Sequence, residues 1–591
     1  MNVSEYIFDY FSGKGINTVF MVPGSQAMYL DDAVFKNKNF EVICTHHEQS
    51  AAMAADAYGR IKNKPAITLV TANPGALNGL ICGYTDSAPM IVVSGQSNSS
   101  YIKYQDETNI RQFGVQGINI KPMVKNYVKY FVIIDSLEKL KLYLDIAYQE
   151  ATTGRPGPVW IDVPLDMQRK NVDIDAFTYF RDDAKKTSFA NERCYNQIID
   201  KLSKSKRPLF IVGQGVSLAH ARNELSQLLG VLKIPVVTAR LGIDLIESDH
   251  PLYVGRPGNY GERSANFAIQ NSDLIISVGC RLAHSLVGHL PDEFGKNAYK
   301  FVVDIDENEL HKPVIKIDTK ICMDCKEFLT GLKKHIIGKL NFNFSEWIAV
   351  CNKWKKEYPV VLPEYKNEKP LNSYYFTDRV SYFASKNTNI IVDVGSCFHV
   401  VSQTWKIKNG QHYIASGGLS YMGFWAAGIG ACLANDKKGT IVFTGDGSLQ
   451  LNVQELATIK HHQLPVKIFI FNNNGYLLIR QAQRTFMDDR FIAESPETGV
   501  WFPDSLEIAK AYGIKGIRIS SAEEVDDKIK KVLSCNGPVI CDVITPKWQT
   551  LIPRRVASDK IPSGELVSYG YANMFPYLSD EEYKQNMISE I

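Results

Sequence analysis

The sequence predicts an α/β protein made of three doubly wound domains, each built on a parallel sheet. Its 591 residues exceed the usual length of a single domain with one hydrophobic core. Short apolar runs typical of strands alternate with helical patterns over most of the chain. Several runs end in glycine, asparagine or aspartate, at the sheet edge where such folds bind ligands. We predict domains at residues 1–170, 190–335 and 365–545, followed by a tail at 546–591.

Composition narrows the class of protein. Charged residues make up 22% of the chain and the net charge is +3, which argues against nucleic acid or an acidic membrane surface as a partner. No apolar run approaches the ~18 residues needed to span a bilayer. Glu5 and Asp9 stand where a signal peptide would carry Lys or Arg. The eleven cysteines are scattered, and we expect free thiols even at the pair Cys322 and Cys325. We therefore expect a soluble cytoplasmic protein with small-molecule partners.

The first predicted domain opens with a helix over 3–11 whose apolar residues share one face. The strand at 42–45 ends in His46-His47-Glu48, directly before an alanine-rich helix. A glutamate in this place either caps the helix or is a functional carboxylate, and the local sequence alone leaves both open. The other strands of this domain are expected at 19–22, 67–70, 90–94 and within 154–164.

The second predicted domain follows a charged linker at 173–191. Its glycine turn Gly213-Gln214-Gly215 is only a weak dinucleotide signal. Its strands are expected at 209–215, 236–237, 274–279 and 301–306, and a charged helical spacer at 342–369 leads into the third domain.

Two neighbouring strands of the third predicted domain end in residues suited to a metal. The strand at 440–444 leads to Asp446, and after one helix the strand at 466–471 leads to Asn473. In a βαβ unit these ends lie side by side at the carboxyl edge of the sheet. A carboxylate and an amide, with a backbone carbonyl, suit Mg²⁺ that carries phosphate oxygens.

The turn around Asp446 also suits the phosphate itself. Gly445 and Gly447 let the backbone close on it, while Ser448 and the first helical N–H groups present a positive end. An ordinary helix N-terminus would explain the glycine turn alone, but the asparagine one helix and one strand later favours a site. Residues 395–397, at the end of the strand at 390–394, form a second candidate phosphate turn.

The stretch GDGSLQLNVQE, followed by FNNNGY, resembles the diphosphate signature of thiamine diphosphate (ThDP) enzymes such as pyruvate decarboxylases and acetolactate synthases. The resemblance implies Asp446, Asn473 and the Gly475 carbonyl as Mg²⁺ ligands. Further cofactor-binding residues expected from the sequence and the resemblance are Pro23, Gly24, Gly75, Asn78, Gly395, Ser396, Cys397, Gly445, Gly447, Ser448, Tyr476 and Leu477.

With this resemblance, Glu48 is similar to the family's activating glutamate. A carboxyl group in an apolar pocket can keep its proton near neutral pH and share it with a ring nitrogen of the coenzyme. Residues 416–424 match the family's SGGLGTMGF. That match implies a Ser420 carbonyl that binds the 4′-amino group and a Met422 side chain that props the bent cofactor, although Met422 could also be a simple core residue.

The central segment departs from acetolactate synthases, whose FAD-binding domain reads GARFDDRVTG where this chain has residues 279–288. Arg281 is kept, but the two acids and the arginine become Ala283, His284 and Ser285. The resemblance therefore leaves the presence of FAD open, and these changes disfavour it.

The reaction expected from the resemblance is decarboxylation of a 2-keto acid followed by carboligation. Ile479 stands where pyruvate decarboxylases carry a glutamate that protonates the decarboxylated product, and Gln112 and Gln116 lie where they carry a His-His pair. An apolar wall without a proton donor favours attack on a second carbonyl, so we count these three residues with Glu48 as candidate catalytic residues. Ala482 replaces a tryptophan of acetolactate synthases and makes room for a larger acceptor, such as a keto-sugar.

Two alternatives stay open at this point: release of an aldehyde by a simple decarboxylase, and a regulatory paralogue that binds the cofactor without turnover. The resemblance further implies a homodimer or homotetramer with active sites shared between subunits. The tail, which ends in MFPYLSDEEYKQNMI, is similar to those of acetolactate-synthase-like proteins from bacterial surface-polysaccharide clusters.

Overall fold

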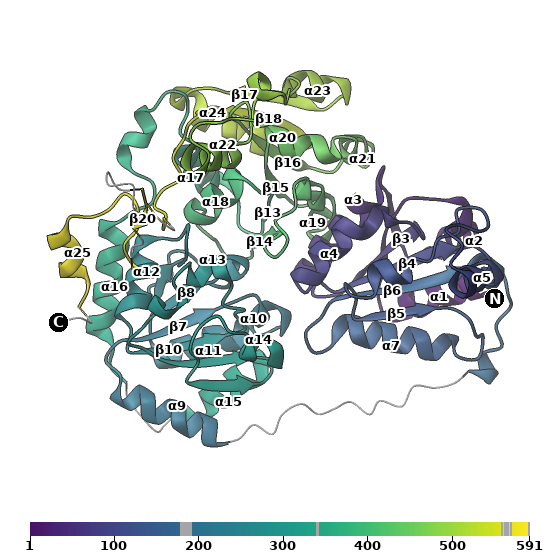
Figure 1. Cartoon of the computed structure of the whole chain (residues 1–591), viewed down its shortest axis with the longest axis horizontal. Helices are drawn as coiled ribbons and strands as arrows, with labels where there is room; N and C mark the ends of the chain where they lie inside the picture. The colour runs from purple at the N-terminus through teal and green to yellow at the C-terminus, as the bar shows by residue number, and fades with distance from the viewer. Residues whose placement is uncertain (178–191, 338–341, 557–558, 561–565, 568–569, 589–591) are drawn as a thin grey trace.

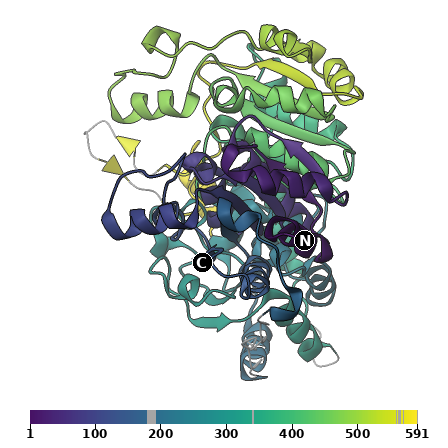
Figure 2. The same cartoon turned by 90° about the vertical axis from the view of Figure 1, so that its right-hand side faces the viewer.

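Three six-stranded parallel sheets organise the chain in the computed structural model, which describes all residues except 178–191, 338–341, 557–558, 561–565, 568–569 and 589–591 (Figure 1). The predicted α/β class with three doubly wound domains is confirmed. Most of the linker predicted at 173–191 lies outside the described residues. We call the three units the N-terminal, central and C-terminal domains. In Figure 2 the N-terminal domain faces the viewer, below the C-terminal domain.

The N-terminal domain has strand order β2-β1-β3-β4-β6-β5, and its four inner strands are buried on both faces. Its strands are β1 (Thr18–Met21), β2 (Glu41–Cys44), β3 (Ala66–Thr71), β4 (Met90–Gln96), β5 (Tyr130–Ile133) and β6 (Pro158–Pro164). The helices are α1 (Val3–Gly13), α2 (Met28–Lys36), α3 (Glu48–Lys62), α4 (Leu77–Thr85), α5 (Ser99–Thr108), α6 (Lys121–Val124), α7 (Leu140–Thr152) and α8 (Leu165–Gln168).

The central domain has strand order β12-β11-β10-β7-β8-β9, so the direction of the chain across the sheet reverses between β7 and β10. Its strands are β7 (Pro208–Val212), β8 (Val236–Thr238), β9 (Tyr253–Gly255), β10 (Leu274–Val278), β11 (Tyr299–Asp304) and β12 (Thr319–Cys322). Its helices are α9 (Glu192–Lys204), α10 (Gly215–Leu218), α11 (Arg222–Leu232), α12 (Arg263–Asn271), α13 (His284–Val287), α14 (Glu307–His311) and α15 (Cys325–Ile336), and α16 (Ser345–Glu357) packs beside α12.

The C-terminal domain has strand order β14-β13-β15-β16-β18-β17. Its strands are β13 (Asn389–Val392), β14 (His412–Ala415), β15 (Thr440–Gly445), β16 (Val466–Asn472), β17 (Lys515–Ile519) and β18 (Val539–Ile544). Its helices are α17 (Ser373–Phe383), α18 (Ser396–Thr404), α19 (Gly428–Ala434), α20 (Asp446–Leu449), α21 (Glu455–His461), α22 (Leu477–Phe486), α23 (Ser505–Ala511) and α24 (Val525–Leu533).

The helix predicted after Asp446 differs from expectation in one respect. It consists of α20, a short 3-10 turn (Gln450–Asn452) and α21. The joining residues Leu449, Val453 and Gln454 keep right-handed helical backbone angles, so the path is continuous but tightened at one turn.

The N-terminal and C-terminal domains share one apolar core around α3. Its alanines are fully buried against α19, and Gly430 on α19 faces the Ala54 carbonyl with no room for a side chain. The alanines of this helix, which was predicted to be alanine-rich, therefore let the two domains approach closely.

The tail packs on the central domain, at the side of α12 and α16 (Figure 1). Arg263 donates to the Met574 carbonyl at 3.0 Å, and the Trp354 indole donates to Asn586 at 2.6 Å. The described tail elements are β19 (Asp559–Lys560), β20 (Leu566–Val567) and α25 (Asp580–Asn586). Within the described part of the chain, no helix is both long enough and apolar enough to cross a bilayer. All eleven cysteines are free, including Cys322 and Cys325.

Candidate active site

The two strand ends predicted to hold a metal meet in the structure. Asp446, 5% exposed, follows β15, and its carboxylate accepts hydrogen bonds from the Gly447 N–H at 2.8 Å and the Gly475 N–H at 3.1 Å. Burial raises the pKa of Asp446 to about 7, although these N–H groups act in the opposite direction. A bound cation would favour the charged carboxylate at this position.

Asn473 supplies the strongest local sign of a ligand. Its side-chain oxygen is buried and has no hydrogen-bond partner among the described residues. An unpaired buried carbonyl oxygen is costly, and a cation beside Asp446 would satisfy it. Across the described residues, no cluster of three or more His, Cys, Asp or Glu could hold a metal, so this mixed set of carboxylate, amide and backbone oxygens is the candidate.

Arg480 supports the turn that follows Asn473. This fully buried guanidinium donates to the Asn474 carbonyl at 3.1 Å and pairs with Glu494 at 2.5 Å. Gly475 lies so close to Arg480 that it has no room for a side chain. The turn is therefore held in place by contacts within the protein, which suits a metal site.

Two glycine turns open toward the same edge of the sheet. A side chain at Gly395 or Gly445 would meet no atom within 4 Å, so both backbones face open space, as a phosphate cradle requires. The Ser448 hydroxyl differs from expectation, because it donates to Asp393 at 2.6 Å and accepts from the Gly423 N–H. The Ser448 hydroxyl is therefore engaged within the protein, contrary to the expectation that it faces a phosphate. The Cys397 thiol likewise points inward, to the Asp393 carbonyl at 3.3 Å.

The segment with Ser420 and Met422 is anchored to the N-terminal domain of the same chain. The Asp86 carboxylate, at the end of α4, accepts from the N–H groups of Gly417 and Gly418, both at 2.8 Å. Ser420 adopts a left-handed backbone conformation with φ +52°. Asp86 was not among the predicted site residues, because nothing local in the sequence indicates which loop it will meet.

Glu48 is the first residue of α3 and lies against the turn at 73–76, which contains Gly75, one of the predicted cofactor-binding residues. Asn73 donates to its carboxylate at 3.2 Å, and a side chain at Gly75 would lie 2.5 Å from it. The cap of α3 is instead His47, whose ring accepts from the Gln49 N–H at 3.1 Å. The capping alternative for Glu48 is therefore not needed to explain this helix start.

The remaining predicted residues lie around these turns. Asn78 donates to the Tyr421 hydroxyl at 2.7 Å, and Gly24 packs against Thr71 beneath the turn that includes Pro23. Gln116 accepts from Ser25 at 2.8 Å, whereas Gln112 is exposed on the same loop. Leu477 is buried at the start of α22, Tyr476 is half-buried, and Ile479 is 48% exposed. The roles of these residues stay predictions.

Comparison with known proteins decides the family. The chain matches three family descriptions in order: "Thiamine pyrophosphate enzyme, N-terminal TPP binding domain" over residues 1–130, "central domain" over 195–332, and "C-terminal TPP binding domain" over 393–543. The chain belongs to the ThDP-dependent enzymes of the acetolactate-synthase-like type. ThDP and Mg²⁺ are the cofactors of this type of enzyme, and the open glycine turns and the unpaired Asn473 oxygen fit them.

Relatives in this family are similar over nearly their whole length. An acetolactate synthase large subunit of Cyanidium caldarium is 33% identical over 553 residues, 91% of this chain and 92% of that protein. The acetolactate synthase isozyme 2 large subunit of Escherichia coli (strain K12) is 30% identical over 560 residues, 94% and 97% of the two chains. The mitochondrial acetolactate synthase catalytic subunit of Saccharomyces cerevisiae is 31% identical, over 92% of this chain and 80% of that protein.

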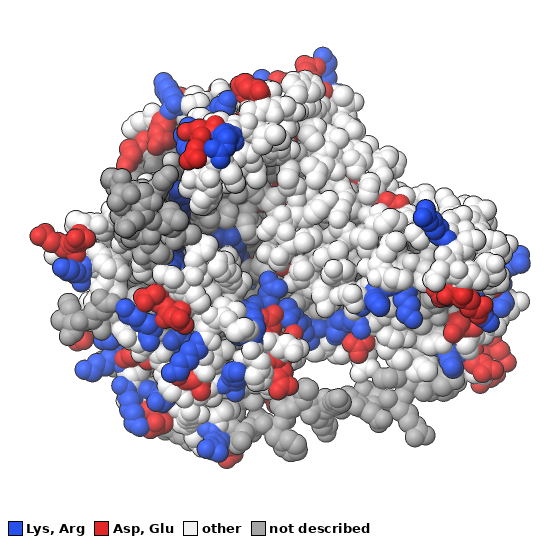
Figure 3. All heavy atoms as spheres, in the orientation of Figure 1, with Lys and Arg blue, Asp and Glu red and all other residues white. Residues whose placement is uncertain are grey.

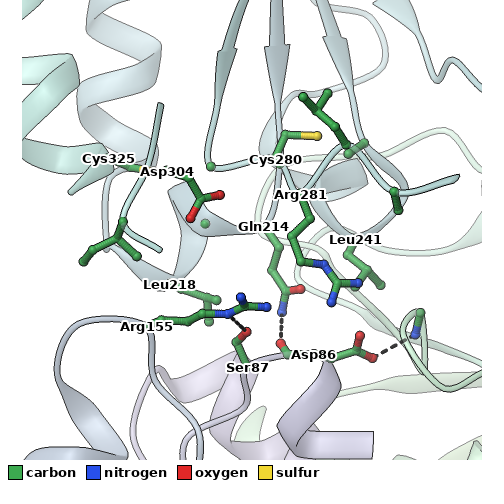
Figure 4. A pocket seen from close by; sticks show the side chains of 18 of the residues that line it. Asp86, Ser87, Arg155, Gln214, Leu218, Leu241, Cys280, Arg281, Asp304 and Cys325 are labelled. Atoms are coloured by element: carbon green, nitrogen blue, oxygen red, sulfur yellow. Dashed lines mark hydrogen bonds between the residues drawn. The ribbon is translucent and has the colours of Figure 1, made fainter. Parts of the chain in front are cut away.

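In this ThDP enzyme, a pocket separate from the Asp446 turn lies at the carboxyl ends of β7 and β10, at the switch point of the central sheet (Figure 4). Arg155 donates to Ser87 at 2.9 Å, and Gln214 donates to the Asp86 carbonyl at 3.1 Å. Residues of the N-terminal domain therefore form one wall of the pocket. Ala283 and Ser285 line it, whereas His284 faces His289 at 3.0 Å. In open α/β sheets, ligands bind at such a switch point.

We expect the purified protein to lack bound flavin, because Ala283 and Ser285 offer this pocket neither the acid nor the arginine of acetolactate synthases. A visible absorption spectrum of the protein, and of the supernatant after heat denaturation, checks this. Incubation with FAD followed by gel filtration is the control for loss during purification. Stoichiometric flavin in either sample would contradict the prediction.

Proposed function

We propose that the protein decarboxylates a 2-keto acid of the pyruvate type and joins the remaining acyl group to a carbonyl acceptor. The observation that carries this is the rim of the cofactor turn, where Leu477, Leu478 and Ile479 offer no proton donor to release an aldehyde. The similarity to acetolactate synthases supports the same choice. Aldehyde release is the alternative, and neither observation favours it.

The chain's own residues would divide the work as follows. Asp446, Asn473 and the Gly475 carbonyl hold Mg²⁺, while the N–H groups at the starts of α18 and α20 hold the diphosphate. Glu48 exchanges a proton with the pyrimidine ring. When bound, ThDP supplies a nucleophilic carbon that adds to the keto group and stabilises the charge left by loss of CO₂. The apolar first turn of α22 excludes water from that carbon.

Incubation of the holoenzyme with pyruvate as the only substrate tests the proposal. We expect CO₂ release with formation of a carboligation product and little free aldehyde. The reason is that the hydrocarbon side chain of Ile479 cannot protonate the decarboxylated product. Products are quantified by NMR, with the heat-denatured enzyme as a blank. Free aldehyde in amounts equal to CO₂ would overturn carboligation and establish the alternative.

We further infer that the active site is shared between two copies of the chain. Among the described residues, the Glu48 side chain bonds only to its own domain, and no hydrogen bond joins it to the Asp446 turn. Large apolar side chains are exposed on the N-terminal domain at 104–115 and on the C-terminal domain at 479–501. They are Tyr104, Ile110, Phe113, Val115, Ile479, Phe486, Met487, Ile492 and Trp501. Figure 3 shows few charged side chains on the surface between the N-terminal and C-terminal domains, as expected for a face that a partner covers.

Mixing two inactive variants tests the shared site. When Glu48→Gln and Asp446→Ala chains are unfolded and refolded together at equal amounts, half of random dimers are mixed, and each mixed dimer has one site without either defect. Recovery of about 25% of the wild-type activity is therefore expected. Each variant refolded alone is the control. Recovery no greater than the controls, with mixed dimers present by native mass spectrometry, would place both residues in one chain's site.

Ala482 on α22 leaves more room than a tryptophan would, and a keto-sugar is our hypothesis for that space. The association with surface-polysaccharide synthesis, a tetramer and the cytoplasmic location stay predictions. A product screen of 2-keto acids against neutral, acidic and sugar carbonyls would identify the acceptor.

A further inference from the structure

Glu455 is a fully buried carboxylate of the C-terminal domain whose hydrogen bonds reach the N-terminal domain. It opens α21, and one of its oxygens accepts from the backbone N–H groups of His46 at 3.0 Å and His47 at 3.1 Å. The other oxygen accepts from the Thr458 hydroxyl at 2.8 Å. The two N–H donors belong to the residues directly before Glu48.

These two bonds determine the course of the backbone into Glu48. A side-chain oxygen that accepts from two successive N–H groups restrains the orientation of two consecutive peptide groups, because each hydrogen bond requires a near-linear N–H···O geometry. No residue separates His47 from Glu48, so a shift of this turn would move the Glu48 carboxyl group relative to Asn73 and Gly75. Removal of the Glu455 side chain would also take away the protein acceptor of two N–H groups at a partly buried interface.

Asn452 acts on the other side of Glu48. Its side-chain oxygen accepts from Gln49 at 2.7 Å and from Ser50 at 3.0 Å, and its amide donates to the Gly423 carbonyl at 2.7 Å. Residues 452–455 therefore hold the chain both before and after Glu48. The same segment begins at Asp446, so one stretch of this domain carries a metal ligand and the support for the glutamate.

We propose that Glu455 is a positioning residue, which holds Glu48 in the orientation that its proton exchange with the cofactor needs. The inference rests on the proposed function, because the role of Glu48 belongs to that proposal. In a dimer with shared sites, Glu455 would support the partner's cofactor site while Asp446, on the same segment, serves its own. A structural role in domain packing alone would leave the cofactor chemistry unchanged.

The first experiment needs no cofactor. Backbone amide exchange of the apoprotein, followed by mass spectrometry, is expected to show loss of protection at residues 44–50 in Glu455→Ala. Glu455→Gln should keep the protection, because one amide oxygen can accept from both N–H groups and the amide nitrogen can donate to Thr458. Thr458→Val, which removes a buried bond at the same interface, should leave residues 46 and 47 protected. Unchanged protection in Glu455→Ala would overturn the inference.

The second experiment measures exchange of the C2 proton of ThDP bound to the full-length holoenzyme. Glu455→Ala should slow it about 10- to 100-fold, as loss of a supporting partner typically does, with ThDP affinity close to wild type. Glu455→Gln and Thr458→Val should exchange at nearly the wild-type rate. If Glu455→Ala does not fold, Glu455→Asp replaces it, since the shorter side chain keeps the charge but withdraws the oxygens from the two N–H groups.

The outcomes separate this inference from the proposed function. If Glu48→Gln slows the exchange and Glu455→Ala does not, only the positioning role fails. If Glu48→Gln leaves the exchange unchanged, the assignment of Glu48 fails first. Equal slowing in Glu455→Ala and Glu455→Gln, or in Thr458→Val, would show that charge or packing, not the two hydrogen bonds, is responsible.

Discussion

Replacement of Glu48 by Gln is expected to slow exchange of the C2 proton of bound ThDP by about 10²- to 10⁴-fold, the usual contribution of a positioned acid or base. Glutamine keeps the size of the side chain and can still accept from Asn73, but it cannot exchange a proton with the pyrimidine ring. Deuterium exchange followed by acid quench and NMR of the released cofactor measures the rate directly. The binding constants of ThDP and Mg²⁺ should stay near those of the wild type.

The control for this variant is Glu107→Gln, an exposed acid on α5 of the same domain. It should exchange at the wild-type rate. A Glu48→Gln enzyme that exchanges as fast as this control would show that another group activates the cofactor. Such a result would also favour the non-catalytic alternative if product formation were absent in the wild type.

Replacement of Asn473 by Leu should weaken ThDP binding without lowering the thermal stability of the apoprotein. Because the Asn473 oxygen is buried and unpaired in the described structure, the apoprotein should lose little thermal stability or gain some. Mg²⁺-dependent ThDP binding should weaken by more than about 100-fold, since loss of a direct ligand should exceed the effect of losing an outer partner. The shift of the melting temperature that ThDP and Mg²⁺ produce in the wild type should disappear.

Asn352→Leu, at an exposed position of α16, is the matched control and should bind ThDP as the wild type does. Calorimetric titration of ThDP at a fixed Mg²⁺ concentration, with melting curves of each apoprotein, provides both measurements. Unchanged ThDP affinity in Asn473→Leu would remove Asn473 from the metal site. A large loss of apoprotein stability would mean that its oxygen has a partner in solution.

Much of the fold could be predicted from local sequence. The apolar runs that end in glycine, aspartate or asparagine became strands of three parallel sheets, because such runs can be buried on both faces only between helices. The meeting of Asp446 and Asn473 was also predictable, since neighbouring strands of a βαβ unit end at one edge whatever the rest of the chain does. The tightened turn after Asp446 was not, because 3-10 and α turns have nearly the same apolar spacing.

The other contacts of the site depend on how domains pack. Asp86 supports the loop with Ser420, and Glu455 holds the residues before Glu48. Glu455 was part of the stretch that carried the family resemblance, yet its spacing from Asp446 says nothing of a partner some 400 positions earlier in the chain. Only the docking of the N-terminal domain on the C-terminal domain, through α3 and α19, brings these groups together.

The sequence by itself determined which residues end the strands and hence which oxygens can face a metal, because short-range geometry sets the ends of a βαβ unit. Only the tertiary structure showed which hydrogen bonds fix the positions of those residues. That choice depends on buried contacts between distant segments, where a carboxylate such as Glu455 or Asp86 must find its N–H donors in another domain or remain unpaired.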